Sequence, residues 1–286
     1  MIWLIGNKGM LGTEVEILLK QNKISCVCSD KEVDITDRRA LDEFVQGKPV
    51  TCIINCSAYT AVDKAETDYA MAFKINHYGV MNICGIAAKR DVPLIHVSTD
   101  YVFDGNASKP YTEEDSINPA GIYAKSKAAG EQEILSACKK YFIVRTAWLY
   151  GRHGNNFVHT MLRLFRERDS VNVVNDQYGS PTYAKDLAAF LLLLTERTKY
   201  GIYHFTGQGV TTWHRFAVEI YEKAKSRGLL SKECIINPVT TDQFPVKAAR
   251  PKYSVLSKEK AERELGYHIP GWEEALLRFM DELKMA

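Results

Sequence analysis

A tyrosine and a lysine four residues apart, Tyr123 and Lys127, are the side chains in this sequence whose types and spacing suit proton transfer. In a helix, a four-residue offset puts both side chains on one face, one turn apart. The lysine ammonium could then lower the pKa of the phenol, and such a phenol can donate a proton to the alkoxide that forms when a carbonyl is reduced. Tyrosine–lysine pairs at this spacing also occur by chance on helix surfaces, so other motifs must support this interpretation.

A glycine-rich turn directly follows the first apolar run of the chain. Gly6, Gly9 and Gly12 have the spacing G-x-x-G-x-x-G, which is typical of extended short-chain dehydrogenases. Such glycines permit a tight turn, let the backbone approach a pyrophosphate and let a helix pack closely on a strand. The N-terminus of the helix that follows supplies amide donors for the phosphates. The motif predicts a dinucleotide-binding turn.

The end of the second apolar run should carry the group that meets the adenine ribose of a dinucleotide. Asp30 lies there and favours a free 2′-hydroxyl, hence NAD, whereas the neighbouring Lys31 could pair with a 2′-phosphate, hence NADP. Asp34, followed by Ile35, is a second candidate for the adenine side. A solvated loop would have the same composition, and the choice between NADH and NADPH stays open.

Hydroxyl side chains end the fourth apolar run, at Ser98 and Thr99. Doubly wound folds bind ligands at the carboxyl edge of the sheet, so either hydroxyl could hydrogen-bond to a substrate carbonyl there. Neighbouring residues of a strand point to opposite faces, and the sequence alone does not choose between the two.

The elements that must position these residues alternate between short apolar runs and longer amphipathic stretches. This alternation predicts an α/β fold with a doubly wound parallel sheet of the Rossmann type, in which helices cover both faces. The predicted strands are residues 2–5, 24–28, 52–55, 94–97 and 142–144, and the predicted helices begin near Met10, Thr36, Glu66 and Pro119.

The rhythm changes after about Gly151, where helix-like segments alternate with short strands near residues 171–174 and 203–205. We therefore expect a dinucleotide-binding domain over residues 1–150 and a smaller, mainly substrate-binding portion over residues 151–286. Some elements of the second portion should return to the main sheet.

Composition favours a small-molecule substrate over nucleic acid or a membrane. The 286 residues are 46% hydrophobic and 25% charged, and a formal net charge of +2 provides no strong field. The N-terminus lacks the features of a signal peptide, and the most apolar later run, 187–194, is too short to span a bilayer. The 7 cysteines include no C-x-x-C pair, which indicates core thiols in a reducing compartment. These features predict a cytoplasmic protein.

Longer motifs resemble one family, the dTDP-4-dehydrorhamnose reductases, over almost the whole chain. They are NCSAYTAVDKAE at 55–66, STDYVFDG at 98–105, YAKSK at 123–127, RTAW at 145–148, GNNF at 154–157, NDQYGSPT at 175–182 and Arg250-Pro251. The resemblance implies reduction of the C4 keto group of dTDP-4-dehydro-β-L-rhamnose by NADPH or NADH, which gives dTDP-L-rhamnose for cell-surface polysaccharide.

The resemblance also implies roles for individual residues. Thr99 would polarise the C4 carbonyl, Tyr123 would deliver the proton, and Lys127 would bind the nicotinamide ribose and tune Tyr123. It assigns the pyrophosphate turn to Gly9, Met10 and Leu11, the cofactor wall to Ala58, Tyr59 and Thr60, and the sugar-nucleotide side to Asp100, Tyr101, Trp148 and Asn156. Arg250 is a candidate diphosphate clamp, because a guanidinium binds phosphate in a bidentate manner.

Some members of the family dimerise through glutamates that hold a magnesium ion. Only Glu14 lies at a matching position here, so the sequence establishes neither Mg²⁺ nor a homodimer.

Two alternatives stay open. A sugar-nucleotide epimerase or dehydratase shares the glycine turn and the tyrosine–lysine pair, and Asp100 after Thr99 would suit a dehydratase. A non-catalytic regulatory subunit, like the one that accompanies methionine adenosyltransferase, has the same fold. The presence of Thr99, Tyr123 and Lys127 together favours catalysis.

Overall fold

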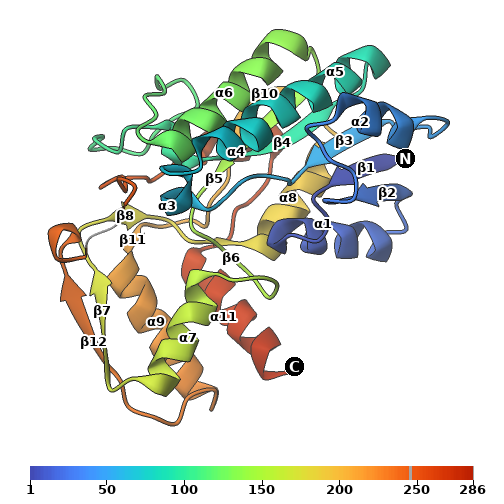
Figure 1. The fold of residues 1–286 in the computed structure, drawn as a ribbon. Helices are drawn as coiled ribbons and strands as arrows, with labels where there is room; N and C mark the ends of the chain where they lie inside the picture. The colour runs from blue at the N-terminus through green and yellow to red at the C-terminus, as the bar shows by residue number, and fades with distance from the viewer. Residues whose placement is uncertain (245–246, 286) are drawn as a thin grey trace.

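A six-stranded parallel sheet forms the larger part of the protein in the computed structural model, which describes residues 1–244 and 247–285 (Figure 1). The strand order is β10-β5-β4-β3-β1-β2, and every neighbouring pair is parallel. The strands are β1 (Ile2–Ile5), β2 (Cys26–Ser29), β3 (Cys52–Asn55), β4 (Leu94–Thr99), β5 (Tyr141–Thr146) and β10 (Gly201–His204). The predicted doubly wound α/β fold is confirmed.

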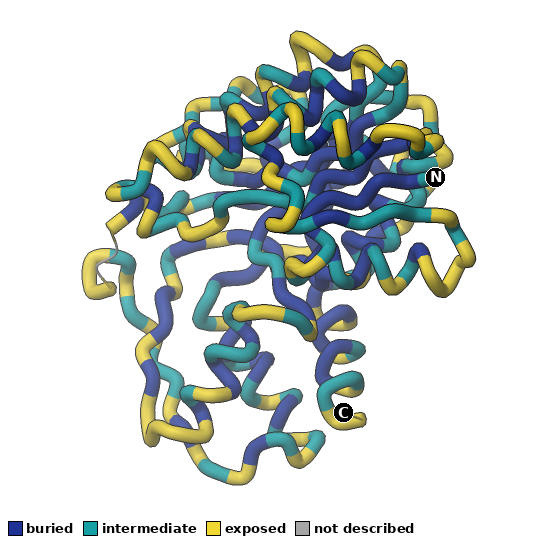
Figure 2. The backbone as a smooth tube through the Cα atoms, turned by 45° about the vertical axis from the view of Figure 1, so that its right-hand side comes forward, coloured by how far each residue is buried: buried dark blue, intermediate teal, exposed yellow. Residues whose placement is uncertain are grey.

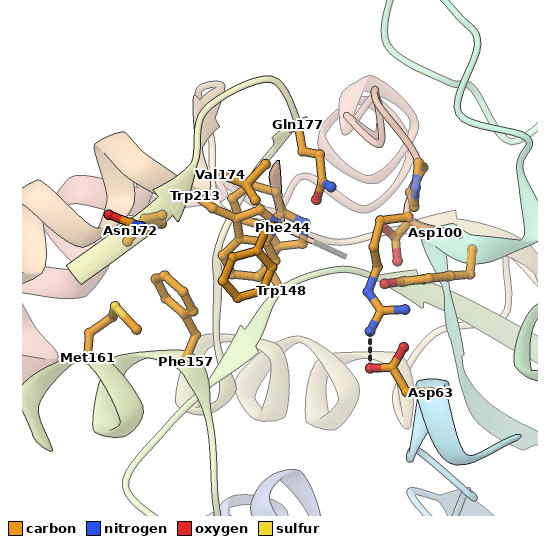
Figure 3. A pocket seen from close by; sticks show the side chains of 14 residues that line it. Asp63, Asp100, Trp148, Phe157, Met161, Asn172, Val174, Gln177, Trp213 and Phe244 are labelled. Carbon is orange, nitrogen blue, oxygen red and sulfur yellow. Dashed lines mark hydrogen bonds and ion pairs between the residues drawn. The ribbon is translucent and has the colours of Figure 1, made fainter. Parts of the chain in front are cut away.

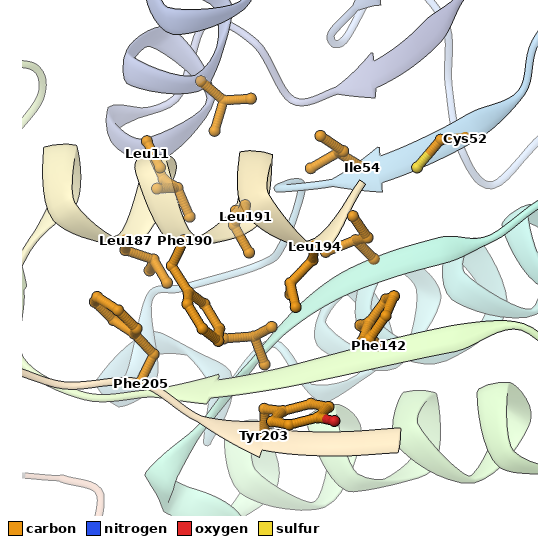
Figure 4. Close-up of a cluster of buried hydrophobic side chains, with 14 of the residues drawn as sticks. Leu11, Cys52, Ile54, Phe142, Leu187, Phe190, Leu191, Leu194, Tyr203 and Phe205 are labelled. Atoms are coloured by element: carbon orange, nitrogen blue, oxygen red, sulfur yellow. The ribbon is translucent and has the colours of Figure 1, made fainter. Parts of the chain in front are cut away.

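Helices cover both faces of this sheet, because side chains at successive positions of each strand point to opposite faces. Ile2 and Leu4 of β1 pack with α1 and α8, and Figure 4 shows part of that cluster. Trp3 and Ile5 pack in a second cluster with α2, α5 and α6 on the opposite face. The four inner strands are therefore buried on both sides, whereas the edge strands β2 and β10 are partly exposed (Figure 2). The helices are α1 (Met10–Gln21), α2 (Arg38–Val45), α5 (Val80–Arg90), α6 (Ile122–Ala137), α8 (Ala184–Leu194) and α10 (Glu259–Leu265).

The helical stretch predicted to begin near Glu66 is present, but it is not a regular α-helix throughout. Short helices α3 (Val62–Ala65) and α4 (Tyr69–Phe73) lie on either side of that position, and the π-helical turn η1 (Lys74–Gly79) joins α4 to α5. In η1, the Asn76 amide donates to the Tyr59 carbonyl and to the Ser126 hydroxyl, and its oxygen accepts from the Tyr59 N–H. The irregular turn thus fixes the segment after β3 against α6.

A third hydrophobic cluster lies in the C-terminal half, between helices α7 (Phe157–Glu167), α9 (Trp213–Ser226) and α11 (Trp272–Lys284). Short parallel or antiparallel pairs border it: β7 (Ser170–Val174) with β12 (Ile235–Val239), β6 (Leu149–Tyr150) with β9 (Thr182–Tyr183), and β8 (Tyr178–Gly179) with β11 (Thr211–Thr212). The 3-10 turns are η2 (Asp100–Val102) and η3 (Thr241–Gln243).

Elements from the second half also build the main sheet unit. β10 pairs with β5, and α8 packs against α1, whereas the strand near residue 171 pairs with β12 in the smaller unit. We therefore propose that the boundary near residue 150 separates cofactor binding from substrate binding. In the structure, however, α8 and β10 belong to the dinucleotide-binding unit.

The glycine turn after β1 requires glycine at two positions. Gly6 has φ +81°, in the left-handed region that side chains disfavour, and a Cβ there would lie 2.7 Å from the Ser57 nitrogen. A Cβ on Gly12 would lie 2.0 Å from the Gly6 carbonyl oxygen. The start of α1 can approach the turn only because Gly12 has no side chain.

We expect the substitution Gly12→Ala to destabilise the protein by about 2 kcal/mol, because overpacking against rigid backbone outweighs the higher helix propensity of alanine. Urea unfolding measures this loss, and fluorescence titration with NADPH should show weaker binding. Gly271→Ala is the matched control, since a Cβ there meets nothing within 4 Å among the described residues. Equal stability of the two variants would contradict the packing argument.

Candidate active site

Tyr123 and Lys127 lie on α6 at the carboxyl edge of the sheet. The helix begins after Gly121, and the Ile122 N–H donates to the Glu66 carboxylate at 2.9 Å, which satisfies one free amide of the first turn. The ring of Tyr123 meets the ring of Tyr101 edge-on, with centroids 5.5 Å apart.

Lys127 is 2% exposed, and its Nζ donates to the Val97 carbonyl at 2.7 Å and lies 3.1 Å from His96 Nε2. Burial lowers the pKa of Lys127 to about 8, against the opposing effects of Glu131 and Cys56. The lysine nitrogen therefore contacts two residues of β4, His96 and Val97, that precede Ser98 and Thr99.

The phenol of Tyr123 has a raised pKa. Burial raises it to about 12, Asp100 adds to the rise, and a hydrogen bond with Thr99 opposes it. The prediction that Lys127 lowers this pKa is wrong for this structure, because desolvation dominates and the lysine nitrogen contacts β4.

The two hydroxyls at the end of β4 have different partners. Ser98 donates to the Glu131 carboxylate inside the protein, whereas the Thr99 hydroxyl donates to Asp100 at 3.0 Å and accepts from the Tyr101 N–H at 3.2 Å. Thr99 also lies close enough to Tyr123 to affect its pKa. Because neighbouring residues of a strand point to opposite faces, Ser98 contacts Glu131 inside the protein, whereas Thr99 faces the Tyr123 phenol.

Asp100 is a buried carboxylic acid next to these hydroxyls. Burial raises its pKa to about 6, although the Thr99 hydrogen bond opposes the rise. Its Oδ2 has no hydrogen-bond partner in the part of the chain that the structure describes. A buried, incompletely satisfied carboxyl at a cavity wall can accept a hydrogen bond from a ligand.

A cavity of about 720 Å³ lies along the carboxyl ends of β1, β2 and β3. The predicted cofactor residues that line it are Gly6, Gly9, Asp30, Asp34, Ile35 and Ala58. Met10, Leu11 and Gly12 form the start of α1 behind the turn, and Thr60 is exposed nearby. The Tyr59 hydroxyl donates to Asp68 at 3.2 Å, and the Tyr59 N–H donates to the Asn76 side chain. These two contacts hold the segment that follows Ala58 in the cavity wall.

The rim of this cavity carries charges of both signs. Asp30 accepts from the backbone N–H groups of Lys8 and Lys31, which holds its carboxylate at the end of β2. The Lys8 ammonium pairs with Glu32 at 2.9 Å. Lys8 of the glycine turn and Ser57 of the motif at 55–66 also line the cavity, and so does Lys74, which lies outside the motifs.

A second cavity, of about 310 Å³, lies between the sheet edge and the C-terminal unit (Figure 3). One end is apolar, with Phe157 and Met161 near the Trp148 and Trp213 rings, and the other end carries the carboxylates of Asp63 and Asp100 (Figure 3). The predicted substrate residues among its lining are Asp100, Tyr101, Trp148 and Arg250.

Trp148 adopts a strained backbone conformation at the wall of this cavity. Its φ is +49°, which is unusual for a bulky residue. The ring stacks on Trp213 with centroids 3.6 Å apart and planes at 11°, and a Cβ on Gly179 would lie 2.6 Å from the ring. Strain of this kind persists where packing enforces it, and it is frequent at ligand sites.

Asn156 and Arg250 have partners within the protein. The Asn156 side chain caps α7: its oxygen accepts from the His159 N–H, and its amide donates to the Gly151 carbonyl. Its neighbour Phe157, the first residue of α7, lines the cavity, so the cap fixes the start of the helix that carries that ring. Arg250 forms an ion pair with Asp63 at 2.7 Å, drawn as a dashed line in Figure 3.

Several residues of the second cavity escaped the sequence analysis. Phe157 and Gln177 belong to the family motifs at 154–157 and 175–182, which could have indicated them. Trp213, Asn172 and Phe244 lie in segments without a motif, and only the packing of α9, β7 and η3 brings them to the cavity.

Glu14, the candidate magnesium ligand, lies among side chains that are paired within the chain. Glu14 is buried and lies 3.6 Å from His153, and Lys185 pairs with Glu282. Residues 1–244 and 247–285 include no group of three or more His, Cys, Asp or Glu that could hold a metal ion. No helix in the described ranges is long and apolar enough to cross a membrane.

The doubly wound sheet, the glycine turn and the Thr99–Tyr123–Lys127 cluster define a nicotinamide-dependent oxidoreductase of the extended short-chain dehydrogenase class. The family model described as the RmlD substrate binding domain matches residues 1–285. A dTDP-4-dehydrorhamnose reductase of Aggregatibacter actinomycetemcomitans is 39% identical over 95% of each chain. The chain belongs to the dTDP-4-dehydrorhamnose reductase family, as its motifs predicted.

Solved structures agree with this assignment. The dTDP-4-dehydrorhamnose reductase of Bacillus anthracis, in complex with NADP, is similar with a TM-score of 0.93 and 39% identity over 98% of both chains. The Clostridium acetobutylicum reductase gives a TM-score of 0.94 and 41% identity over 99% of both. A UDP-glucose 4-epimerase of Thermus thermophilus, at 19% identity over 100% of this chain and 99% of its own, shares the fold with a TM-score of 0.84.

The raised pKa of Asp100 predicts a pH dependence of stability. Folding raises this pKa from 3.8 to about 6, so the folded protein binds the proton more tightly than the unfolded chain does. The stability contributed by the protonated carboxyl is present below about pH 4 and is lost as the pH rises to about 6, by an amount on the order of 3 kcal/mol.

Asp100→Asn removes this titration. We expect the free energy of unfolding of the variant, relative to the unsubstituted protein, to increase between pH 4 and pH 7, as measured by urea unfolding followed by tryptophan fluorescence. Asp242→Asn, at an exposed position, is the control. A difference for Asp100→Asn that does not change with pH would contradict the buried-carboxyl assignment.

Proposed function

We propose that this protein reduces the C4 keto group of dTDP-4-dehydro-β-L-rhamnose with NADPH or NADH and thereby forms dTDP-L-rhamnose. The observation that carries the proposal is the position of α6 between the two cavities. Tyr123 packs on Tyr101, which lines the 310 Å³ cavity, whereas Lys127 lies near Cys56, which lines the 720 Å³ cavity. A hydride donor in one cavity and a ketone in the other would meet beside Thr99 and Tyr123.

The larger cavity has the features that a nicotinamide dinucleotide requires. Gly9 precedes α1 and has no side chain to cap it, so the first amides of a 12-residue helix are available for a pyrophosphate. Gly6, Gly12 and the wall at Ser57 and Ala58 shape the turn that would receive it. When bound, the cofactor supplies the hydride.

In the proposed mechanism, Thr99 orients the C4 carbonyl and Tyr123 holds the proton. A phenol whose pKa is raised to about 12 stays protonated at neutral pH and transfers its proton only to a stronger base, such as the alkoxide formed at C4. Lys127 would bind the nicotinamide ribose from underneath.

The smaller cavity provides a matching surface for a sugar nucleotide. The stacked indoles of Trp148 and Trp213 offer an aromatic face for a base or a sugar ring. Arg250, held by Asp63, offers guanidinium N–H groups for the diphosphate, and Asp100 and Tyr101 line the end nearest Thr99. We assign these residues to substrate binding, with Asn156 acting through Phe157.

We further propose that the protein works in the cytoplasm, where nucleotide sugars and reduced nicotinamides are available and its cysteines stay reduced. A homodimer stays a prediction.

A direct assay tests the function. Purified protein with dTDP-4-dehydrorhamnose and either cofactor should oxidise one reduced nicotinamide per sugar reduced, followed by absorbance, and the product should be dTDP-L-rhamnose. The buried carboxyl of Asp100 favours a second candidate, a dehydratase or epimerase, which would return the cofactor to its initial state in every turnover. Absence of oxidation with both cofactors, together with an unchanged sugar nucleotide, would favour the regulatory subunit.

We expect Tyr123→Phe to reduce kcat at least about 100-fold, because it removes the proton donor and leaves the packing on Tyr101. The Kd for NADPH, measured by fluorescence, should change less than about twofold. Tyr78→Phe, at an exposed tyrosine, is the matched control. Full turnover in Tyr123→Phe would exclude Tyr123 as the proton donor.

A further inference from the structure

A segment of the C-terminal half, residues 248–257, borders the smaller cavity, and we call this segment the strap. Backbone hydrogen bonds hold its later part on two sides. The Tyr178 N–H donates to the Lys252 carbonyl at 2.8 Å, and the Tyr253 N–H donates to the Gly105 carbonyl at 3.1 Å. The later part of the strap is therefore fixed to two other segments by its backbone alone.

Arg250 lies near the start of the strap, and the proline that follows restrains its backbone. A residue before proline is confined mainly to extended conformations. Pro251 itself packs on Gly105, where a Cβ would lie 2.4 Å from the Pro251 Cβ. The backbone at Arg250 is therefore held on its C-terminal side, whereas the long side chain needs a partner of its own.

Asp63 of α3 provides that partner through a closed set of three hydrogen bonds. Its Oδ2 accepts from Arg250 Nη2 at 2.7 Å, and its Oδ1 accepts from the Ala248 N–H at 3.0 Å. Arg250 Nη1 in turn donates to the Ala248 carbonyl at 3.1 Å. The guanidinium is therefore bound at both of its amino groups and cannot rotate without breaking one of these bonds.

The bound guanidinium still has N–H groups for a ligand. A guanidinium carries more N–H donors than the two that these bonds use. Arg250 and Asp63 line the smaller cavity at the end that carries Asp100 (Figure 3). The N–H groups that remain can therefore bind a phosphate group that enters this end of the cavity.

The charge of Asp63 is unfavourable for such a ligand. Burial raises the pKa of Asp63, but the hydrogen bonds from Ala248 and Arg250 outweigh burial and hold this pKa below its ordinary value. The side chain is therefore a carboxylate at neutral pH, and it repels a phosphate group. A carboxylate at this place requires a compensating benefit, and the fixed orientation of Arg250 provides one.

We propose that Asp63 is a positioning residue for substrate binding: it fixes the Arg250 guanidinium in the orientation that receives the diphosphate, and this gain exceeds the repulsion by its own charge. The inference rests on the proposed function, because the diphosphate belongs to the proposed substrate. α3 begins directly after the cofactor wall at residues 58–60. The same chain segment would thus border the dinucleotide in one cavity and hold the phosphate-binding arginine of the other.

Binding of dTDP to the full chain without cofactor tests the proposal. Asp63→Asn keeps the shape of the side chain, removes its charge and turns an NH₂ group toward one of the two donors. We expect the Kd for dTDP, measured by calorimetry, to rise about fivefold or more, because a charge-assisted hydrogen bond to the strap is lost. If Asp63 acted only through its charge, the same substitution would lower this Kd. A lower or unchanged Kd in the folded variant would therefore overturn the proposal.

Thymidine separates a lost phosphate contact from a general loss of structure. This nucleoside has no phosphate group, so its Kd, measured by ligand-observed NMR, should change less than about twofold in Asp63→Asn. The Asp63 side chain is 44% exposed. Because exposed ion pairs contribute little to stability, the midpoint of urea unfolding should shift by less than about 0.5 M. Equal weakening of thymidine and dTDP would overturn the proposal.

Substitution of Arg250 shows whether Asp63 acts through it. Arg250→Ala should raise the Kd for dTDP about tenfold or more. In that background, Asp63→Asn should leave the Kd unchanged or lower it, because only the repulsion between the carboxylate and the diphosphate remains to be removed. The same increase in both backgrounds, or no effect of Arg250→Ala, would overturn the proposal.

Asp242→Asn is the matched control, because it makes the same chemical change at an exposed position of η3. Its Kd for dTDP should stay within about twofold of that of the unsubstituted protein, since solvent and salt screen an exposed charge. A weakening as large as that of Asp63→Asn would contradict a specific role of Asp63.

In the reductase assay, Asp63→Asn should raise KM and change kcat less than about twofold, because the diphosphate is attached at C1 of the sugar, away from the ketone at C4. If the unsubstituted protein shows the expected dTDP binding but no turnover, the proposed function is rejected and the role of Asp63 stands. If the protein is active but the expected binding pattern is absent, the role of Asp63 is rejected and the function stands.

Discussion

The geometry of the site depends on a buried ion pair. Arg145 of β5 binds the Glu131 carboxylate of α6 at 2.7 Å, with both side chains at most 3% exposed, and Ser98 of β4 donates to the same carboxylate. Removing one partner from such a pair typically costs about 3–5 kcal/mol, because the other charge is left buried and unpaired. The pair therefore fixes α6 relative to two strands. Thr99 follows Ser98 directly, and Lys127 lies one turn before Glu131, so one interaction sets the position of the whole proton-transfer cluster.

The same burial determines the protonation of that cluster. Desolvation penalises charged forms, so it raises the pKa of Tyr123 and lowers that of Lys127. A protonated phenol is the form that reduction of a ketone requires, whereas a phenolate would suit the reverse oxidation. If the charge of Lys127 stabilised the phenolate more than burial destabilises it, the pKa of Tyr123 would be lowered. Here Lys127 Nζ contacts His96 and the Val97 carbonyl of β4. The low polarity around Tyr123 therefore determines that its phenol stays protonated.

Local sequence patterns predicted those features that depend on neighbours in the chain. The strands at 2–5 and 52–55 and the start of α1 at Met10 agree with their predicted bounds, because apolar runs and glycine turns are local signals. β4 extends two residues further, through the polar Ser98 and Thr99, since buried partners satisfy both hydroxyls. The helical stretch predicted near Glu66 contains a π-helical turn in which Asn76 contacts Tyr59 and Ser126, and periodicity does not reveal such contacts. Trp213 reaches the smaller cavity only through the packing of α9.

Trp148 shows how the two units of the protein are joined at the site. It lies between β5 of the main sheet and β6 beside the C-terminal cluster, so its positive φ redirects the chain from one unit to the other. A conformation of this kind costs on the order of 1–3 kcal/mol and persists only where the surroundings enforce it. Stacking on Trp213 of α9 and the space left by Gly179 enforce it here. The indole is thereby held over the smaller cavity by contacts from the C-terminal unit, while the backbone that carries it continues directly from β5. Recognition at this cavity is consequently coupled to the packing of α9, and a change in α9 that releases Trp213 would also release the strain at Trp148.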